Sequence, residues 1–239
     1  MGIEFRVLGP LEVEVQGRPV PVGGRKQRAL LGALLVHPNA PLSTERLVDD
    51  VWGDSPPTAP VRSVQVYVSA LRTAFGAEAG VLETTTHGYR LLVGEQQLDA
   101  RRFERAAHDV KVLLARGEAA KAAEVAAGGL ALWRGGAYGD LADFPFARSE
   151  VRRLETLQLE TADDRLEAEL ALGHHDRVVG ELEGVVESHP LRERSRRQLM
   201  LALHRCGRQA DALAVFRAGR RQLIDELGLE PGRELQHLH

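Results

Sequence analysis

The segment that decides the fold is residues 58–93, TAPVRSVQVYVSALRTAFGAEAGVLETTTHGYRLLV. Its first part predicts a helix that begins near Thr58 and buries one face. The apolar positions of that face recur at helical spacing: Val64, Val68, Leu71 and Phe75. Its second part predicts a β-hairpin, because two β runs, Val81–Thr85 and Tyr89–Val93, flank the turn residues His87-Gly88.

The residues before this segment predict a small antiparallel sheet followed by two helices. Apolar residues alternate in Ile3–Val7 and Leu11–Val15, and Gln16-Gly17 predicts a turn into a third run at Arg18–Val22. Two helical stripes follow: Leu30, Leu31, Leu34 and Leu35, ended by Pro38, and then Leu47, Val48, Val51 and Trp52, for which Ser43 is the predicted N-cap. The predicted order is therefore sheet, three helices, hairpin.

From residue 99 onward the chain shows helical periodicity and almost no β signal. Leu98 and Phe103 flank Asp99 as the two partners of a hydrophobic staple, which predicts a helix start there. Gly117 interrupts the helical pattern, and residues 133–145 form an irregular stretch. A long helix over about 147–172 carries two apolar stripes, so we expect it to be packed on two sides.

This second half also contains a repeat of 34 residues. Leu172-Gly173-His174 recurs as Cys206-Gly207-Arg208, and large apolar residues, Leu182 and Phe216, stand nine positions after each glycine. The period matches that of tetratricopeptide helix pairs, which usually bind partners and rarely catalyse reactions. The sequence predicts an α+β protein with a mixed domain over 1–97 and an all-α domain over 98–239.

No motif of enzyme chemistry stands out. Cys206 is the one cysteine, and no glycine-rich phosphate loop is present. The adjacent acids Asp49-Asp50 and Asp163-Asp164 are interpreted as solvated faces, and His174-His175-Asp176 as a surface turn. We therefore expect no enzyme activity, no cofactor and no metal site. The longest apolar stretches are far short of a membrane span and no secretory leader is apparent, so a cytoplasmic protein without a membrane partner is expected.

The charge pattern is more informative than the formal net charge of −3. Residues 1–98 hold nine basic and ten acidic side chains, which alone argues against a nucleic-acid binder. However, residues 15–44 and 55–77 contain basic side chains and no acid. Two acid-free helices in a small domain predict one positive face, which phosphate contact requires.

Several side chains on these helices are candidates for DNA contact. Arg25, Lys26 and Arg28 begin the first helix, where a bound phosphate would favour them; Ser43, at the start of the second, is a further candidate for phosphate. The outward side chains of the third helix are all hydrogen-bonding types suited to base edges: Arg62, Ser63, Gln65, Ser69, Arg72 and Thr73. The alternative for each of these residues is an ordinary solvated side chain.

The hairpin beyond the third helix offers short hydroxyl groups and a basic side chain at its tip. The candidates for contact with the DNA backbone or minor groove are Thr84, Thr85, Thr86, His87 and Arg90. Tyr89 is expected to anchor the hairpin on the domain instead.

Five stretches of the first half resemble the DNA-binding domain of the Streptomyces antibiotic regulatory protein family. They are FRVLGPL (5–11), GRKQRALL (24–31), LVDDVWG (47–53), VQVYVSALR (64–72) and GYRL (88–91). Three stretches of the second half are similar to that family's bacterial transcriptional activator domain: HPLRERSRR (189–197), GRQADAL (207–213) and ELGLEPG (226–232).

The resemblance implies an OmpR-type winged helix-turn-helix whose third helix enters the major groove, with the hairpin as the wing. It further implies an activator of secondary-metabolite (antibiotic) genes that binds direct repeats in promoter DNA side by side, as a dimer on DNA. Such regulators recruit RNA polymerase holoenzyme through sigma factor and the α subunit, which would place this chain at the nucleoid. The alternative is a helical-repeat adaptor or regulatory module that does not read DNA.

Overall fold

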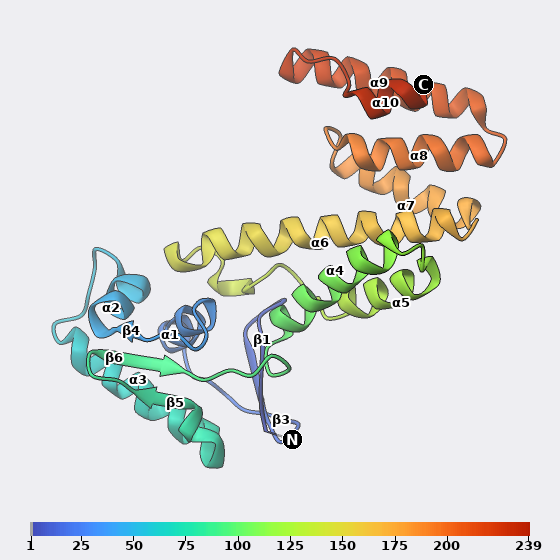
Figure 1. Cartoon of the computed structure of the whole chain (residues 1–239). Helices are drawn as coiled ribbons and strands as arrows, with labels where there is room; N and C mark the ends of the chain where they lie inside the picture. Colours follow the sequence, from blue (N-terminus) through green and yellow to red (C-terminus); the bar gives the residue numbers. More distant parts are fainter. Residues whose placement is uncertain (1) are drawn as a thin grey trace. The chain divides into compact units, whose positions relative to one another are not determined.

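The structure is a computed structural model that describes residues 2–239, and these fall into two compact units. The first unit comprises the chain up to Arg105 together with Gly129–Gln158. The second comprises Ala106–Gly128 and Leu159–His239. The predicted fold class is confirmed, because the mixed α/β part comes first and the remainder is helical (Figure 1).

The first sheet is the predicted antiparallel meander. It consists of β1 (Ile3–Arg6), β2 (Glu12–Val15) and β3 (Arg18–Pro19), in that order. Phe5 is paired with Val13, so their side chains share the buried face. Gln16 and Gly17 form the turn with φ of 53° and 77°, the left-handed conformation that a two-residue hairpin turn requires.

Three helices follow, with the predicted buried stripes. They are α1 (Arg25–Val36), α2 (Thr44–Trp52) and α3 (Pro60–Phe75), followed by the short 3₁₀ helix η1 (Gly76–Val81). The Ser43 hydroxyl accepts a hydrogen bond from the Arg46 amide at 3.1 Å, which confirms the predicted N-cap. On α3 the buried positions are the four predicted ones, Val64, Val68, Leu71 and Phe75.

A second sheet joins the hairpin to the start of α2. Its strand order is β4 (Leu42–Ser43), β6 (Gly88–Leu91), β5 (Leu82–Thr84), all antiparallel. The sequence did not predict β4, because a strand of two residues has no detectable alternation. A Cβ atom at position 88 would lie 2.0 Å from the Leu42 carbonyl oxygen, so the β4–β6 pairing requires glycine there.

Residues 129–158 belong to the core of the first unit, although the predicted domain boundary lies after residue 97. This segment contains η2 (Gly139–Leu141) and the first part of α6 (Pro145–Ala171). The side chains of Tyr138, Leu141 and Phe146 are buried in the same apolar cluster as the helices of the winged helix-turn-helix. Gly32 of α1 provides the space for this packing, since a Cβ there would lie 3.0 Å from Leu141.

Asp99, at the start of α4 (Asp99–Ala115), ties this helix to the loop after β1. Its Oδ1 accepts hydrogen bonds from the amides of Val7, at 2.8 Å, and Ala100, and its Oδ2 accepts one from the Leu8 amide at 3.1 Å. The side chain is 4% exposed. Burial raises the pKa of Asp99, and the amide donors and Arg134 partly oppose that shift.

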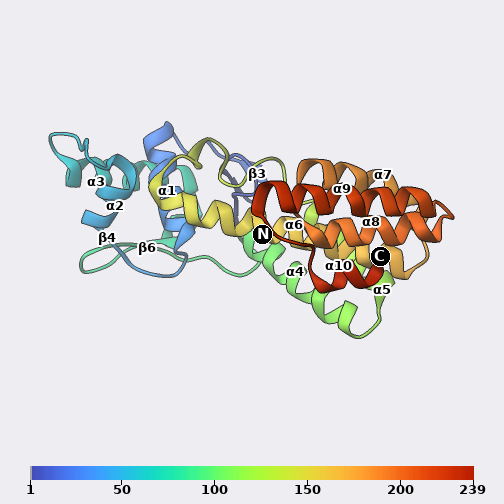
Figure 2. The same ribbon diagram turned by 90° about the horizontal axis from the view of Figure 1, so that it is seen from above.

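The second unit consists of paired helices. Besides parts of α4, α5 (Ala119–Leu130) and α6, it contains α7 (His175–Ser188), α8 (Glu193–Arg205), α9 (Gln209–Leu227) and α10 (Arg233–Leu238). Helix α8 packs between α7 and α9 and also contacts α10 (Figures 1 and 2). Within residues 2–239, no helix combines the length and the apolar composition needed to cross a bilayer.

The predicted repeat appears in the backbone as three identical helix ends. After Gly117, Gly173 and Gly207 the next residue's amide bonds to the carbonyl five residues back: Glu118 to Leu113, His174 to Glu169 and Arg208 to Leu203. These glycines have φ between 73° and 84°. This is the Schellman motif, in which glycine takes the left-handed position.

The acidic pair Asp163-Asp164 was predicted to be solvated, and this was wrong. Both side chains are buried, with exposed fractions of 1% and 4%. Arg192 pairs with Asp163, and Arg194 pairs with Asp164 at 2.5 Å. Arg196 of α8 is also buried, with 3% exposure, and donates to the Val215 carbonyl of α9 at 3.0 Å, so these three arginines join the start of α8 to its neighbours. Asp50 is likewise buried and pairs with Arg46.

A fragment ending at residue 97 is expected to be largely unfolded. It lacks Tyr138, Leu141 and Phe146, and burying each such side chain stabilises a protein by about 1.5–3 kcal/mol. The sum is comparable to the whole stability of an ordinary domain. Circular dichroism during a urea titration measures this. A cooperative transition at the midpoint of the 239-residue chain would show that residues 1–97 fold alone.

Asp99→Asn is expected to lower the free energy of unfolding by about 1–3 kcal/mol. The amide side chain offers one acceptor oxygen instead of two, which leaves a buried backbone amide of Val7 or Leu8 facing another donor. The matched control is Asp109→Asn on the same helix, where the side chain is exposed. Equal unfolding midpoints for the two variants would contradict this role of Asp99.

Candidate nucleic-acid interface

The outer face of α3 presents the predicted polar side chains. Arg62, Gln65, Ser69 and Thr73 are exposed, whereas Ser63 and Arg72 are half-buried. No acidic residue occurs in this helix. Within residues 2–239 the guanidinium of Arg62 and the amide of Gln65 have no hydrogen-bond partner, so both remain available to a ligand.

Two hydroxyl groups on α3 bond to the helix itself. Ser63 Oγ donates to the Ala59 carbonyl at 3.2 Å, and Thr73 Oγ1 donates to the Ser69 carbonyl at 3.0 Å. Their donors are satisfied by these bonds, and their oxygens remain free to accept. These two side chains are therefore oriented as acceptors on the α3 face.

Arg72 is directed toward the hairpin. Its Nε and Nη2 donate to the Leu82 carbonyl at 3.0 and 2.7 Å, and Nη2 also donates to Thr84 Oγ1 at 2.8 Å. Of the six residues predicted to read bases, Arg72 is the one whose side chain bonds to another element of the fold.

The wing is the turn between β5 and β6, Thr84–His87. Thr84, Thr86 and His87 are exposed, Thr85 is half-buried, and the Thr85 amide donates to the Gly88 carbonyl at 2.9 Å. Arg90 instead pairs across the strands with Glu83 at 2.6 Å, so the guanidinium has a partner within the hairpin. Tyr89 is buried, which confirms its predicted role as an anchor.

The start of α2 lies against the tip of the wing. The Thr44 amide donates to the His87 carbonyl at 3.0 Å, and β4 pairs with β6 at Ser43 and Gly88. The Ser43 hydroxyl caps α2, and its side chain is half-buried. Hydrogen bonds thus join the start of α2, the wing and the last turn of α3 (Figure 1).

The cations at the start of α1 have partners within the first unit. Arg28 pairs with Asp140 at 2.8 Å, and Arg25 donates to the Asp140 carbonyl at 3.4 Å. Lys26 donates to the Val51 carbonyl at 2.6 Å. Arg25 and Lys26 also lie over the ring of Phe144. These residues therefore have a structural role. Phosphate contact by Arg25 and Lys26 stays a prediction, whereas Arg28, half-buried and paired with Asp140, is now expected to contribute to stability instead.

Two exposed valines on α3 were not predicted from the sequence. Val61 and Val66 are 52% and 56% exposed. Val66 stands four residues after Arg62 and three before Ser69, so it shares their face of the helix. Val66 lies in the sequence between Val64 and Val68 of the buried stripe, so it resembles a core residue there. The helical period of that stripe nevertheless places Val66 on the exposed face.

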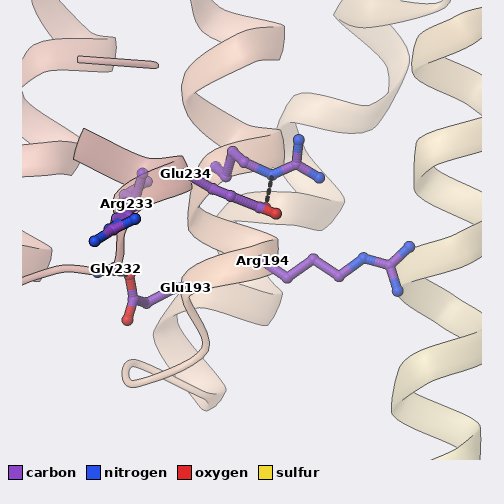
Figure 3. A pocket seen from close by; sticks show the side chains of 7 residues that line it. Glu193, Arg194, Gly232, Arg233 and Glu234 are labelled. Atoms are coloured by element: carbon purple, nitrogen blue, oxygen red, sulfur yellow. Dashed lines mark hydrogen bonds and ion pairs between the residues drawn. The ribbon is translucent and has the colours of Figure 1, made fainter. Parts of the chain in front are cut away.

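A hollow of about 370 Å³ lies in the helical unit where α8 and α10 begin. In Figure 3 the side chains of Arg194 and Glu193 point in different directions. Arg194 pairs with Asp164 and Glu167, and Glu193 accepts a hydrogen bond from the Gly232 amide. Glu234 lies 3.8 Å from Arg197. These pairings leave no convergent ligand set, and residues 2–239 contain no group of three potential metal ligands.

Comparison with known families identifies both halves of the chain. Residues 18–91 match the family described as transcriptional regulatory protein, C terminal, and residues 98–239 match the bacterial transcriptional activator domain.

Several regulators are similar over 99% of this chain. The regulatory protein DnrI of Streptomyces peucetius is 35% identical, with 90% of its length covered, and the regulatory protein AfsR of Streptomyces coelicolor is 37% identical, with 24% covered. A solved structure of Mycobacterium tuberculosis EmbR, in complex with low affinity phosphopeptide, superposes with a TM-score of 0.94 at 34% identity over 63% of that chain. This chain thus spans about a quarter of AfsR and less than two thirds of EmbR.

Proposed function

Because the chain belongs to the Streptomyces antibiotic regulatory protein family of transcriptional regulators, we propose that it is a sequence-specific activator that binds promoter DNA. It occupies direct repeats side by side as a dimer and recruits RNA polymerase holoenzyme through sigma factor and the α subunit. Its targets are genes of secondary metabolism, and it acts at the nucleoid in the cytoplasm.

The observation that carries this proposal is the acid-free outer face of α3, flanked by the wing. Arg62 and Gln65 are exposed on it without a partner in the described chain. Arg can grip guanine through O6 and N7, and Gln can pair with adenine, each contact contributing about 1–3 kcal/mol of discrimination. A helix that offers these groups, with no carboxylate to repel phosphates, fits the major groove.

Further side chains complete the proposed interface. Ser63, Ser69 and Thr73 offer hydroxyl oxygens to base edges, and Val66 offers an apolar surface suited to a thymine methyl group. Ser43 at the start of α2, together with Thr84, Thr85, Thr86 and His87 of the wing, would bond to the backbone. Arg90 adds positive charge beside the wing, although its ion pair with Glu83 offsets part of that charge.

The helical unit supplies the proposed contact with the transcription machinery. Its helices α7, α8 and α9 repeat in the manner of tetratricopeptide pairs, a scaffold that typically binds protein partners. If the chain were a protein adaptor instead, this unit would function without any DNA affinity, and the experiments below separate the two functions.

Arg62→Ala is expected to weaken binding to a cognate promoter fragment by about 1–3 kcal/mol and to relax base preference at one position. Gel shifts on the promoters upstream of and neighbouring the protein's own gene, at fixed salt, measure this, with footprinting to give the repeat. Arg116→Ala is the control, since Arg116 follows α4 in the helical unit. Absence of any salt-dependent DNA affinity in the unsubstituted chain would favour the adaptor.

Arg25 and Arg28 form a matched pair that tests phosphate contact at α1. The Arg25 side chain is 59% exposed, so Arg25→Ala is expected to reduce the salt slope of binding by about one. The Arg28 side chain is 25% exposed and pairs with Asp140, so Arg28→Ala is expected to lower stability and leave the slope unchanged. An unchanged slope for Arg25→Ala would remove Arg25 from the phosphate contacts.

A further inference from the structure

We propose that Arg72 is a positioning residue that fixes the wing to the recognition helix α3, and that it does not read a base. This inference rests on the proposed DNA binding, but its structural part can be measured without DNA. The sequence pattern predicted that Arg72 reads a base, because Arg72 and Arg62 both lie outside the buried stripe of α3. The bonds of Arg72 to β5 indicate the positioning role instead.

The guanidinium group of Arg72 is directed at β5 and away from the outer face of α3. Nε and Nη2 both donate to the Leu82 carbonyl, and Nη2 reaches Thr84 Oγ1 as well. Contact with a base edge through Nε or Nη2 would require the side chain to break hydrogen bonds to β5. Arg62, ten residues earlier on the same helix, has no such bonds within the described chain.

The Leu82 carbonyl lies on the side of β5 that has no partner strand within the described chain. The Val81 carbonyl accepts from the Leu92 amide, and the Thr85 amide donates to the Gly88 carbonyl, so odd-numbered residues direct their backbone groups toward β6. The carbonyl of Leu82 therefore points to the opposite side, where β5 is the edge strand. Arg72 supplies the donors that this carbonyl would otherwise lack.

Arg72 attaches the β5 side of the hairpin to α3, whereas α2 and β4 hold the β6 side. At the tip, the Thr44 amide of α2 donates to the His87 carbonyl. At the base, Arg72 bonds to Leu82 and Thr84. The spacing between α3 and the wing determines whether both reach the same DNA segment, so a loose wing weakens binding to every sequence.

The two roles predict different results for Arg72→Ala. A positioning residue contributes equally to all operators, so its loss lowers affinity by a similar factor, about 5- to 150-fold, for the cognate fragment and for each single-base-pair variant. A base-reading residue contributes at one base pair, so its loss would abolish discrimination at that position only. Arg62→Ala is the matched control and should show the second pattern.

The experiment measures gel-shift affinities of the 239-residue chain, Arg72→Ala, Arg72→Lys and Arg62→Ala on the same set of operator variants. Ethylation interference should show lost phosphate contacts at the wing in Arg72→Ala and retained contacts at α3. Lysine keeps the positive charge but lacks the planar guanidinium group, so Arg72→Lys should also lose affinity by a similar factor on all operator variants. If Arg72→Ala fails to fold, Arg72→Lys provides the test. Loss of preference at one base pair alone would overturn the proposal.

Hydrogen exchange of the free protein keeps the test independent of DNA. Faster exchange of the Thr85 and Leu92 amides is expected in Arg72→Ala and Arg72→Lys, with no change in Arg62→Ala. Unchanged exchange in the wing of both Arg72 variants would overturn the positioning role even if DNA binding fell. If the unsubstituted chain binds no promoter, the proposed function fails, and exchange alone decides whether Arg72 holds the wing.

Discussion

The buried carboxylate of Asp99 is the interaction on which the first unit depends. It accepts the amides of Val7 and Leu8, which follow β1, and so holds the start of α4 against the first sheet. Residues 129–158 of this unit are attached to the same loop after β1, because the Arg134 amide donates to the Leu8 carbonyl and the Tyr138 amide donates to the Val7 carbonyl. Backbone and side chain together thus make residues 129–158 part of the core that supports α3.

Local patterns predicted most of the fold. The spacing of Val64, Val68, Leu71 and Phe75 fixed which face of α3 is buried, because a period of 3.6 leaves one solution for four apolar residues. Gln16-Gly17 and the glycines of the helical repeat were equally informative, since few residues adopt left-handed backbone without strain. These features depend on neighbours within a few positions, which is why one sequence suffices to predict them.

Features that depend on distant partners could not be predicted. Asp163 and Asp164 look solvated on a helix considered alone, and only the position of α8 brings Arg192 and Arg194 to them. The same applies to Arg28 and Asp140, which are separated by 112 residues. The α3 face shows both cases: its exposure followed from periodicity, whereas the bonds of Arg72 to β5 required the tertiary fold.

The distribution of charge explains how a chain with a formal net charge of −3 can present the proposed face for DNA. Salt screens charges beyond about 8–10 Å at ordinary ionic strength, so a phosphate responds to the side chains beside it and little to the total. On α3 these side chains are uncharged or basic, while the acids of α2 include Asp50, which Arg46 neutralises. Non-specific attraction to DNA should then be weak, and specificity must come from a few placed contacts. That requirement makes the geometry between α3 and the wing more important than the amount of positive charge, because each contact is effective only when the others are made at the same time.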